Sequence, residues 1–494
     1  MKILRSSSGA LSIEDRTERA LWASTVAPTL QGAPPKAFIG SLYPYQLDGF
    51  RWLSFMAQSG LGCIVADEMG LGKTIQVICL LLEAVEQKRR PNLVISPATV
   101  LENWRRELAR FAPLLHVLVH SGSQRTGFPD KLLCHDVVIT SFETAVADIS
   151  LLRNVQWNVV VVDEAQGIKN PDAKRTIQLK TLPRTCAVAV TGTPVENRLK
   201  DLWSIADFVL PSLLGSLSEF EIRHPDTVEG AAVLEPIVSP LILRRSVVEV
   251  ASDLPERIDI PQPLELDDAS AQAYEIIRAE ASSGKGSAGL AAVTTLRMFC
   301  THPWLTGHLL NVGDAVRCST KLSRLFEVIE EMAMGGGKAI IFTSYHESIN
   351  LLVSEINAHF GIPVDFIDGR IAVPLRQQKV DALAATEAAA VLVLNPKAAG
   401  TGLNITAANH VIHFNLEWNP AVEDQASARS HRRGQARAVT VHRFFYVNTI
   451  EEIINDRMQR KRQLATTAVV GTDGQAQEMD DILRALRISP VSHH

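Results

Sequence analysis

The chain has 494 residues, more than one ordinary hydrophobic core holds, so two principal domains with insertions are expected. Its composition, 46% hydrophobic and 21% charged, excludes a disordered chain, and no apolar run approaches the roughly 18 residues that a membrane-spanning helix needs. The net charge of −5 does not by itself suggest nucleic-acid binding, and residues 1–16 show no secretory signal, so we expect a cytoplasmic protein, nucleoid-associated if it is prokaryotic.

A phosphate-binding loop is predicted where the first strong strand signal ends. The apolar run Cys63–Ala66 is followed by DEMGLGKT, residues 67–74, and then by an apolar-periodic helix pattern. In such a strand, turn and helix start, the backbone N–H groups favour an anion, Lys73 can reach the outer phosphates and Thr74 can hold a magnesium ion. A strict P-loop has glycine where Asp67 stands, so the pattern also allows a Gly-Leu-Gly loop that caps an ordinary helix.

Two acidic residues follow a second strand signal. The β-branched run Val159–Val162 is typical of a strand covered on both faces, and Asp163 and Glu164 come directly after it. Carboxylates at the carboxyl end of a parallel strand suit a magnesium ligand and a base that polarises the attacking water. An acidic strand end that faces solvent is the alternative, and the presence of Lys73 and Thr74 disfavours it.

Two later segments could complete the same site. Thr191–Pro194 ends an apolar strand pattern and on its own indicates only a turn. Gln425 begins a run that contains Arg429, Arg432 and Arg433, and arginines three apart lie on one helical face. Because roughly 350 residues separate this run from the phosphate loop, arginines that complete the site would come from a second domain.

Strand and helix patterns alternate in both halves of the chain. The expected strands are Cys63–Ala66, Asn92–Ser96, His116–Val119, Asp136–Thr140, Val159–Val162, Cys186–Val190, Ala339–Thr343, Val364–Ile367, Ala390–Leu394, His410–Phe414 and Thr440–Tyr446. Alternation of this kind gives doubly wound parallel sheets with ligands at the carboxyl ends of the strands. We therefore expect an α/β protein with two such lobes in tandem.

The stretch from Leu213 to Thr320 has a different character, because its helical patterns are broken by glycines and prolines. We interpret it as helical insertions that pack on the first lobe and cross between the lobes. The expected division is a lead-in at 1–40, an ATP-binding lobe at 41–212, helical protrusions and a linker at 213–320, a second lobe at 321–465 and a C-terminal brace or tail at 466–494.

Eleven sequence blocks follow one another between Leu42 and about Arg487. They are LYPYQLDGFRWL, DEMGLGKT, ISPATVLENWRREL, ITSFE, DEAQGIKN, TGTPVEN, LILRRS, LRMFCTHPWL, AIIFTSY, AAGTGLNITAANHVIHFNLEWNP and DQASARSHRRGQ. In this order they resemble the Swi/Snf-like group of superfamily-two helicase-related ATPases, the family of chromatin remodellers and their bacterial relatives. The resemblance implies two tandem RecA-like lobes with helical insertions between them, in a compact prokaryotic member.

The resemblance also implies roles for individual residues. The implied ATP-binding residues are Gln46, Gly70, Leu71, Gly72, Lys73, Thr74, Gly402 and Gln425. The implied catalytic residues are Lys73, Asp163, Glu164, Arg429 and Arg432, with Thr74 and Asp163 as magnesium ligands. Glu164 would be the water-activating base, and Arg429 and Arg432 would be arginine fingers from the second lobe. The implied nucleic-acid contacts are Trp104, Thr140, Ser344, Lys397, Thr401 and Trp418.

The implied activity is that of a translocase that depends on ATP and Mg²⁺. It would hydrolyse ATP at the cleft between two lobes and move along double-stranded DNA or remodel protein–DNA complexes, with backbone contacts and little sequence preference. A strand-separating helicase and an ATP-gated DNA-binding or scaffold subunit of a larger complex, such as an anti-phage system, stay open. A protein partner is expected to be a nuclease, an RNA polymerase or a defence-complex subunit, and no membrane partner is expected.

Overall fold

The structure is a computed structural model, and its chain divides into two compact units. It describes residues 2–5, 11–14, 32–192, 198–250, 254–282, 287–307, 314–399, 403, 405–464, 481, 484 and 487–491. The first unit comprises Met1–Ser252 with Thr467–Thr472, and the second comprises Asp253–Thr466 with Asp473–His494. Each unit has its own sheet and its own hydrophobic core, so each is described by itself.

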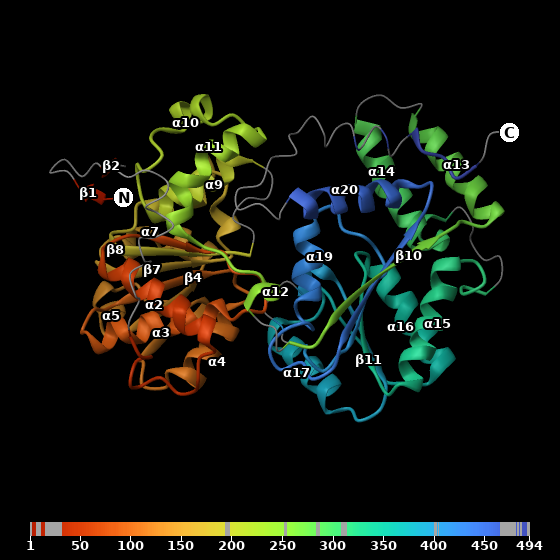
Figure 1. The fold of residues 1–494 in the computed structure, drawn as a ribbon. Helices are drawn as coiled ribbons and strands as arrows, with labels where there is room; N and C mark the ends of the chain where they lie inside the picture. Colours follow the sequence, from red (N-terminus) through yellow and green to blue (C-terminus); the bar gives the residue numbers. More distant parts are fainter. Residues whose placement is uncertain are drawn as a thin grey trace. The chain divides into compact units, whose positions relative to one another are not determined.

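The first unit is built on a seven-stranded sheet in which all neighbouring strands are parallel (Figure 1). The strand order is β5-β6-β4-β7-β8-β3-β9. The strands are β3 (Cys63–Val65), β4 (Asn92–Ser96), β5 (Val117–His120), β6 (Val137–Ser141), β7 (Trp157–Asp163), β8 (Arg184–Val190) and β9 (Ile242–Leu243). Every residue of β3, β4 and β6 is buried, as expected for a parallel sheet covered on both faces.

Helices cover both faces of this sheet. The described helices of this unit are α2 (Pro44–Gln58), α3 (Lys73–Glu86), α4 (Leu101–Phe111), α5 (Pro129–Leu133), α6 (Phe142–Ala147), α7 (Ile149–Leu152), α8 (Lys174–Lys180), α9 (Leu199–Val209), α10 (Leu217–Arg223), α11 (Val228–Val238) and α12 (Val247–Val250). Figure 1 shows α9, α10 and α11 on one side of the strands and α2, α3 and α4 on the other. A short antiparallel pair, β1 (Lys2–Arg5) and β2 (Leu11–Glu14), precedes them.

The second unit has a six-stranded sheet, also parallel throughout, in the order β10-β15-β14-β11-β13-β12. The strands are β10 (Arg257–Leu264), β11 (Lys338–Phe342), β12 (Val364–Ile367), β13 (Ala390–Leu394), β14 (His410–His413) and β15 (Val439–Tyr446). The helices are α13 (Asp268–Ser282), α14 (Ser287–Thr301), α15 (Thr320–Met334), α16 (His346–Phe360), α17 (Val373–Ala385), α18 (Pro396–Ala399), α19 (Pro420–Ser427) and α20 (Ile450–Leu464).

Alternate residues of the second sheet enter different cores. In β11, Ala339 and Ile341 join the core under α15 and α16, while Ile340 and Phe342 join the core under α17 and α19. A further apolar cluster joins α13, α14 and α20 to the end of β15. There the Tyr274 hydroxyl accepts a hydrogen bond from the backbone N–H of Ile450 (2.9 Å).

The predicted α/β class with two parallel-sheet lobes is confirmed. All the strands expected from the sequence are present, within one or two residues at their ends. The stretch from 213 to 320 was expected to be helical, but it also contributes β9 to the first sheet and β10 to the second. Its helices divide as well, because α10 and α11 pack into the core of the first unit, and α13 and α14 pack into the second.

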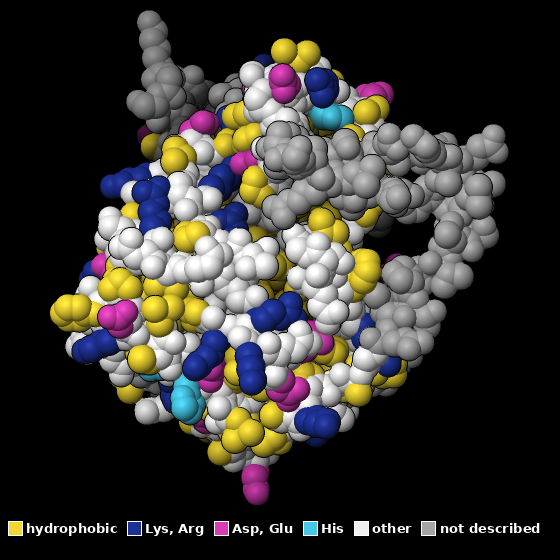
Figure 2. Space-filling view, turned by 90° about the vertical axis from the view of Figure 1, so that its left-hand side faces the viewer, with side chains coloured by type: hydrophobic (Ala, Val, Ile, Leu, Met, Phe, Trp, Pro, Cys, Tyr) yellow, Lys and Arg dark blue, Asp and Glu magenta, His cyan; other side chains and the backbone are white. Residues whose placement is uncertain are grey.

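Charged side chains are dispersed on the face of the molecule that Figure 2 shows. On the face that Figure 2 shows, Lys and Arg side chains form small groups among acidic and apolar ones. Among the described residues on this face no large basic patch stands out, in keeping with the acidic net charge of −5. In the described part of the chain, no helix has both the length and the apolar character of a membrane span.

Candidate nucleotide site and nucleic-acid loops

The phosphate loop between β3 and α3 has a conformation that its glycines allow. Gly70 (φ +92°) and Gly72 (φ +78°) lie in the left-handed region, where other residues are strained. Gly72 is the N-cap of α3, and a Cβ there would lie 2.5 Å from Gln46 Nε2. The loop therefore needs glycine at 72, and it leads into a helix start whose first N–H groups suit an anion.

Gln46 of α2 braces this loop. Its side chain is only 4% exposed, and its Nε2 donates to the Leu71 carbonyl (3.1 Å) and to the Tyr45 hydroxyl (3.3 Å). Its Oε1 accepts from the backbone N–H of Tyr43 (3.1 Å). The amide thus fixes the loop beside Gly72, and the role of Gln46 in ATP binding stays a prediction.

Lys73 lies over the same loop. Its ammonium donates to the backbone carbonyls of Asp67 (2.7 Å) and Glu68 (3.4 Å). Thr74 follows in the first turn of α3 and is half-buried. A cation held over the loop beside a helix N-terminus fits the phosphates of a nucleotide.

The end of β7 presents two carboxylates. Asp163 Oδ2 accepts from the indole Nε1–H of Trp104 in α4 (2.8 Å), and Asp163 Oδ1 accepts from the backbone N–H of Glu164 (2.9 Å). Burial of the carboxyl, with the nearby charge of Glu164, raises the pKa of Asp163 to about 7. A divalent cation favours the charged form and would offset this effect, so the pair fits a magnesium ligand.

Gln166 links Glu164 to the end of β8. Its Nε2 donates to Glu164 Oε2 (2.7 Å), and its Oε1 accepts from Thr191 Oγ1 (3.1 Å). A Cβ at Gly192 would lie 2.8 Å from Cε of Met69, the flexible end of a side chain in the phosphate loop, so the end of β8 lies beside that loop. The structure thus brings together the predicted segments that follow β3, β7 and β8.

Arg245 is a residue of this site that the sequence did not single out. It follows β9, and its Nε donates to Asp67 Oδ1 (3.0 Å) while its Nη2 bonds Asp67 Oδ2 and Gln76 Oε1 (3.0 Å). Its carbonyl accepts from the backbone N–H of Glu68 (2.9 Å). The LILRRS block contained the signal, two arginines after a strand, but a sequence block does not reveal which residue its arginine contacts.

The predicted residues of the second half gather within the second unit. Gln425 lies on α19, and Arg429 and Arg432 lie in the turns that follow; all three are half-buried. The Arg429 carbonyl accepts from the backbone N–H of Ile405 (3.0 Å), which fixes the turn. Lys73 and the acidic pair belong to the first unit, so each predicted set is assembled in its own unit.

Two of the predicted nucleic-acid contacts are wrong. Trp104 and Thr140 are both fully buried. Trp104 belongs to the apolar stripe Leu101, Trp104 and Leu108 that α4 turns toward the core. Thr140 lies in β6, and its hydroxyl donates to the His120 carbonyl (2.9 Å). Neither side chain reaches the surface, so neither can contact a nucleic acid.

The other predicted contacts lie near the second sheet. Ser344 and Trp418 are half-buried in the loops after β11 and β14, and Lys397 belongs to α18. Thr401 and Gly402 lie outside the described residues, as do Thr193 and Pro194. In the described residues no three His, Cys, Asp or Glu side chains gather as a ready-made metal-ligand set.

Comparison with known proteins places these features in a family context. Residues 45–305 match the model of the SNF2-related domain, and residues 320–434 match the model of the helicase conserved C-terminal domain. The chain is 37% identical over 468 residues to YwqA of Bacillus subtilis (strain 168), covering 90% of this chain and 50% of that protein. It is 32% identical over 492 residues to the Zorya protein ZorD of Escherichia coli O139:H28, covering 87% of this chain and 45% of that protein.

A solved structure is also similar in sequence. The SWI2/SNF2 ATPase core of Sulfolobus solfataricus in complex with dsDNA is 34% identical, with 93% of this chain and 99% of that chain covered and a TM-score of 0.47. The chain spans about half the length of curated relatives that it matches.

Proposed function

Because the chain belongs to the SNF2-related family, we propose that it is a DNA-dependent ATPase that moves along double-stranded DNA or remodels protein–DNA complexes. The observation that supports this most directly is the meeting of three motifs at one edge of the first sheet. The phosphate loop, the acidic pair and the end of β8 are joined there through Gln166 and by the close approach of Gly192 to Met69. Ligands of open parallel sheets bind at this edge.

In this proposal the first unit binds the nucleotide. Lys73 and Thr74 hold the phosphates, Thr74 and Asp163 hold magnesium, and Glu164 is the base that activates water. Magnesium, when bound, neutralises charge on the phosphates. The remaining assigned contacts in this unit are Gln46, Gly70, Leu71 and Gly72.

The second unit supplies the arginines. We assign Arg429 and Arg432 the role of stabilising the charge that develops during hydrolysis, with Gln425 and Gly402 as further nucleotide contacts. Hydrolysis then depends on both units, which is how turnover would be coupled to movement. The division into lobes at 41–212 and 321–465, with protrusions and a linker at 213–320 and a brace at 466–494, is part of the same proposal.

Duplex DNA is the proposed substrate. Contacts from Ser344, Lys397, Thr401 and Trp418 to the phosphate backbone would carry little sequence information, so weak sequence preference and strong salt dependence are expected. Strand displacement on a forked duplex would favour a helicase instead. Binding that responds to ATP without DNA-stimulated turnover would favour a scaffold subunit, for which a pull-down would seek the nuclease, polymerase or defence-complex partner.

The test is ATP turnover with and without duplex DNA. We expect DNA to stimulate the rate, Lys73→Ala to abolish it without loss of fold, and Arg432→Ala to lower it by about a hundredfold or more with little change in DNA affinity. Arg437→Ala is the control, because this exposed arginine follows in the same run and donates instead to the Gly336 carbonyl. Equal rates with and without DNA would contradict the proposal.

A further inference from the structure

Two loops at the carboxyl edge of the second sheet carry the proposed DNA contacts Ser344 and Trp418. They follow β11 and β14, which are neighbouring parallel strands. Ser344 Oγ donates to Glu417 Oε1 (2.6 Å), and Glu417 directly precedes Trp418. The two loops are therefore tied to each other, so whatever fixes one of them affects both.

Asn415 is the residue that fixes them. It is only 4% exposed, and its Oδ1 accepts from Thr343 Oγ1 (2.6 Å) and from the backbone N–H of Ser344 (3.4 Å). Because Oδ1 of Asn415 accepts these two bonds, its Nδ2 is the donor on the other side, and it donates to the hydroxyl of Thr301. The Thr301 hydroxyl in turn donates to the Arg297 carbonyl (2.9 Å). Every role in this chain of hydrogen bonds is thus consistent with the donors and acceptors available.

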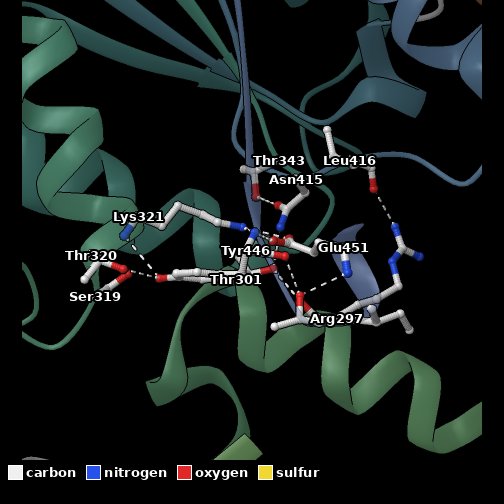
Figure 3. Close-up of polar contacts among 12 residues, drawn as sticks. Arg297, Thr301, Ser319, Thr320, Lys321, Thr343, Asn415, Leu416, Tyr446 and Glu451 are labelled. Carbon is white, nitrogen blue, oxygen red and sulfur yellow. Dashed lines mark hydrogen bonds and ion pairs between the residues drawn. The ribbon is translucent and has the colours of Figure 1, made fainter. Parts of the chain in front are cut away.

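The far end of this series of hydrogen bonds lies on helix α14. Thr301 is fully buried, and Arg297, one turn earlier, donates from Nη2 to the Leu416 carbonyl (3.0 Å). Figure 3 shows Arg297 reaching Leu416, with Asn415 bonded to Thr343 beside it. One helix therefore bonds two successive residues of the loop that leads to Trp418.

Helix α14 is itself a firm support. Its residues Leu296, Phe299 and Cys300 are fully buried in the cluster that α20 completes with Ile450 and Ile454. A buried polar network on such a base holds its members in one arrangement when every group is satisfied.

We propose that Arg297 and Thr301 are positioning residues that set the two DNA-contacting loops of the second unit through Asn415 and Leu416. This assigns a role to the LRMFCTHPWL block, which the nucleotide site does not use. The proposal rests on the proposed function, because it concerns how tightly DNA is held and not how ATP is cleaved.

The experiment uses the full chain and two measurements, ATP turnover as a function of duplex concentration and anisotropy of a fluorescein-labelled duplex. Thr301→Val keeps the shape of the side chain but removes the hydroxyl, leaving Asn415 Nδ2 without its acceptor. We expect about a tenfold rise in the duplex concentration that gives half-maximal stimulation. Turnover without DNA, turnover at saturating DNA and the KM for ATP should stay as in the wild type.

Three further variants sharpen the result. Thr301→Ser restores the hydroxyl and should restore DNA affinity. Thr295→Val is the matched control, because this threonine on the same helix makes the same kind of bond to the carbonyl four residues back, that of Ala291 (3.1 Å). Arg297→Gln shortens the half-buried side chain that bonds the Leu416 carbonyl. If Thr301→Val does not fold, the DNA affinity of Arg297→Gln tests the positioning role instead.

The outcomes are distinct. No stimulation of the wild type by DNA would overturn the proposed function. A stimulated wild type whose Thr301→Val and Arg297→Gln variants keep its DNA affinity would overturn the positioning role alone. Loss of turnover without DNA in parallel with loss of DNA affinity would also overturn it, because the residues would then be merely structural.

Discussion

Asp67 occupies the position where a strict phosphate loop has glycine, and its surroundings explain the acid. The carboxylate is fully buried and receives two donors of the Arg245 guanidinium. A Cβ at Gly49 would lie 1.8 Å from Gln76 Oε1 and 2.7 Å from Arg245 Nη2, so this glycine of α2 leaves room for the Gln76 and Arg245 side chains. Asp67, the residue that departs from the strict pattern, therefore anchors the phosphate loop to the segment after β9.

The ion pair between Asp67 and Arg245 predicts the effect of Arg245→Ala. The change leaves a buried carboxylate without its partner, so we expect the free energy of unfolding of the first unit to fall by about 3–5 kcal/mol and the KM for ATP to rise. Urea unfolding and ATP titration measure the two effects.

The control for Arg245 is Arg51→Ala. Arg51 pairs with Asp48 at 3.1 Å on the surface, with side chains 28% and 66% exposed, and removal of such a pair costs about 1 kcal/mol or less. Asp67→Ala/Arg245→Ala should recover part of the lost stability, because no charge then stays buried alone. An Arg245→Ala protein as stable as Arg51→Ala would show that the pair does not anchor the loop.

Trp104 shows where residue-level prediction from sequence stops. The block around it identifies the segment correctly as a helix after a strand, yet a helical tryptophan can face the core or the solvent. Here α4 turns it inward, and its indole N–H bonds Asp163 Oδ2 (2.8 Å). Lys73, Asp163 and Thr191 could be placed at one sheet edge from the sequence, because the carboxyl ends of parallel strands share that edge.

At the scale of elements, one buried ion pair joins the starts of two helices in the second unit. Lys321 of α15 is fully buried, Glu451 of α20 is 3% exposed, and Lys321 Nζ lies 2.7 and 2.6 Å from the two carboxylate oxygens. Glu451 Oε2 also accepts from the backbone N–H of Tyr446 at the end of β15 (3.0 Å). The pair thus ties α15, α20 and β15 together (Figure 3).

Lys321→Met should therefore destabilise the second unit. We expect the free energy of unfolding to fall by about 3–5 kcal/mol, because Glu451 is left buried without its ionic partner, and Lys321→Met/Glu451→Leu should recover much of the loss. Fluorescence-monitored urea unfolding measures both variants. If Lys321→Met lowered the free energy of unfolding by less than about 1 kcal/mol, the Lys321–Glu451 pair would be behaving as an exposed ion pair does.

Two of the four strands that the sequence did not predict, β9 and β10, have weak signals for physical reasons. β9 has only two residues, too few for any periodicity to show. β10 contains Pro261 and Pro263, and proline within a run argues against a central strand. Both strands lie at sheet edges, where one side of the backbone needs no hydrogen-bonding partner. A very short strand and a strand that contains proline can therefore form there, although neither shows a clear strand pattern in the sequence.

At the scale of the whole molecule, the division of residues between two compact units is the feature with the largest consequence. The first unit contains the phosphate loop and the acidic pair with a complete core of its own, while Arg429 and Arg432 belong to the second. A unit with its own core can fold alone. Nucleotide binding and nucleotide cleavage should therefore be separable by cutting the chain between the units.

A fragment of residues 32–252 tests this separation. We expect it to unfold cooperatively and to bind ATP with Mg²⁺, because Lys73, Thr74 and Asp163 are all present. Its turnover should be lower than that of the full chain by about a hundredfold or more, since it lacks the proposed arginine fingers. The full-length Arg432→Ala variant should be similarly slow. A fragment that hydrolyses ATP as fast as the full chain would show that the first unit is catalytically complete, and the role assigned to Arg429 and Arg432 would have to be abandoned.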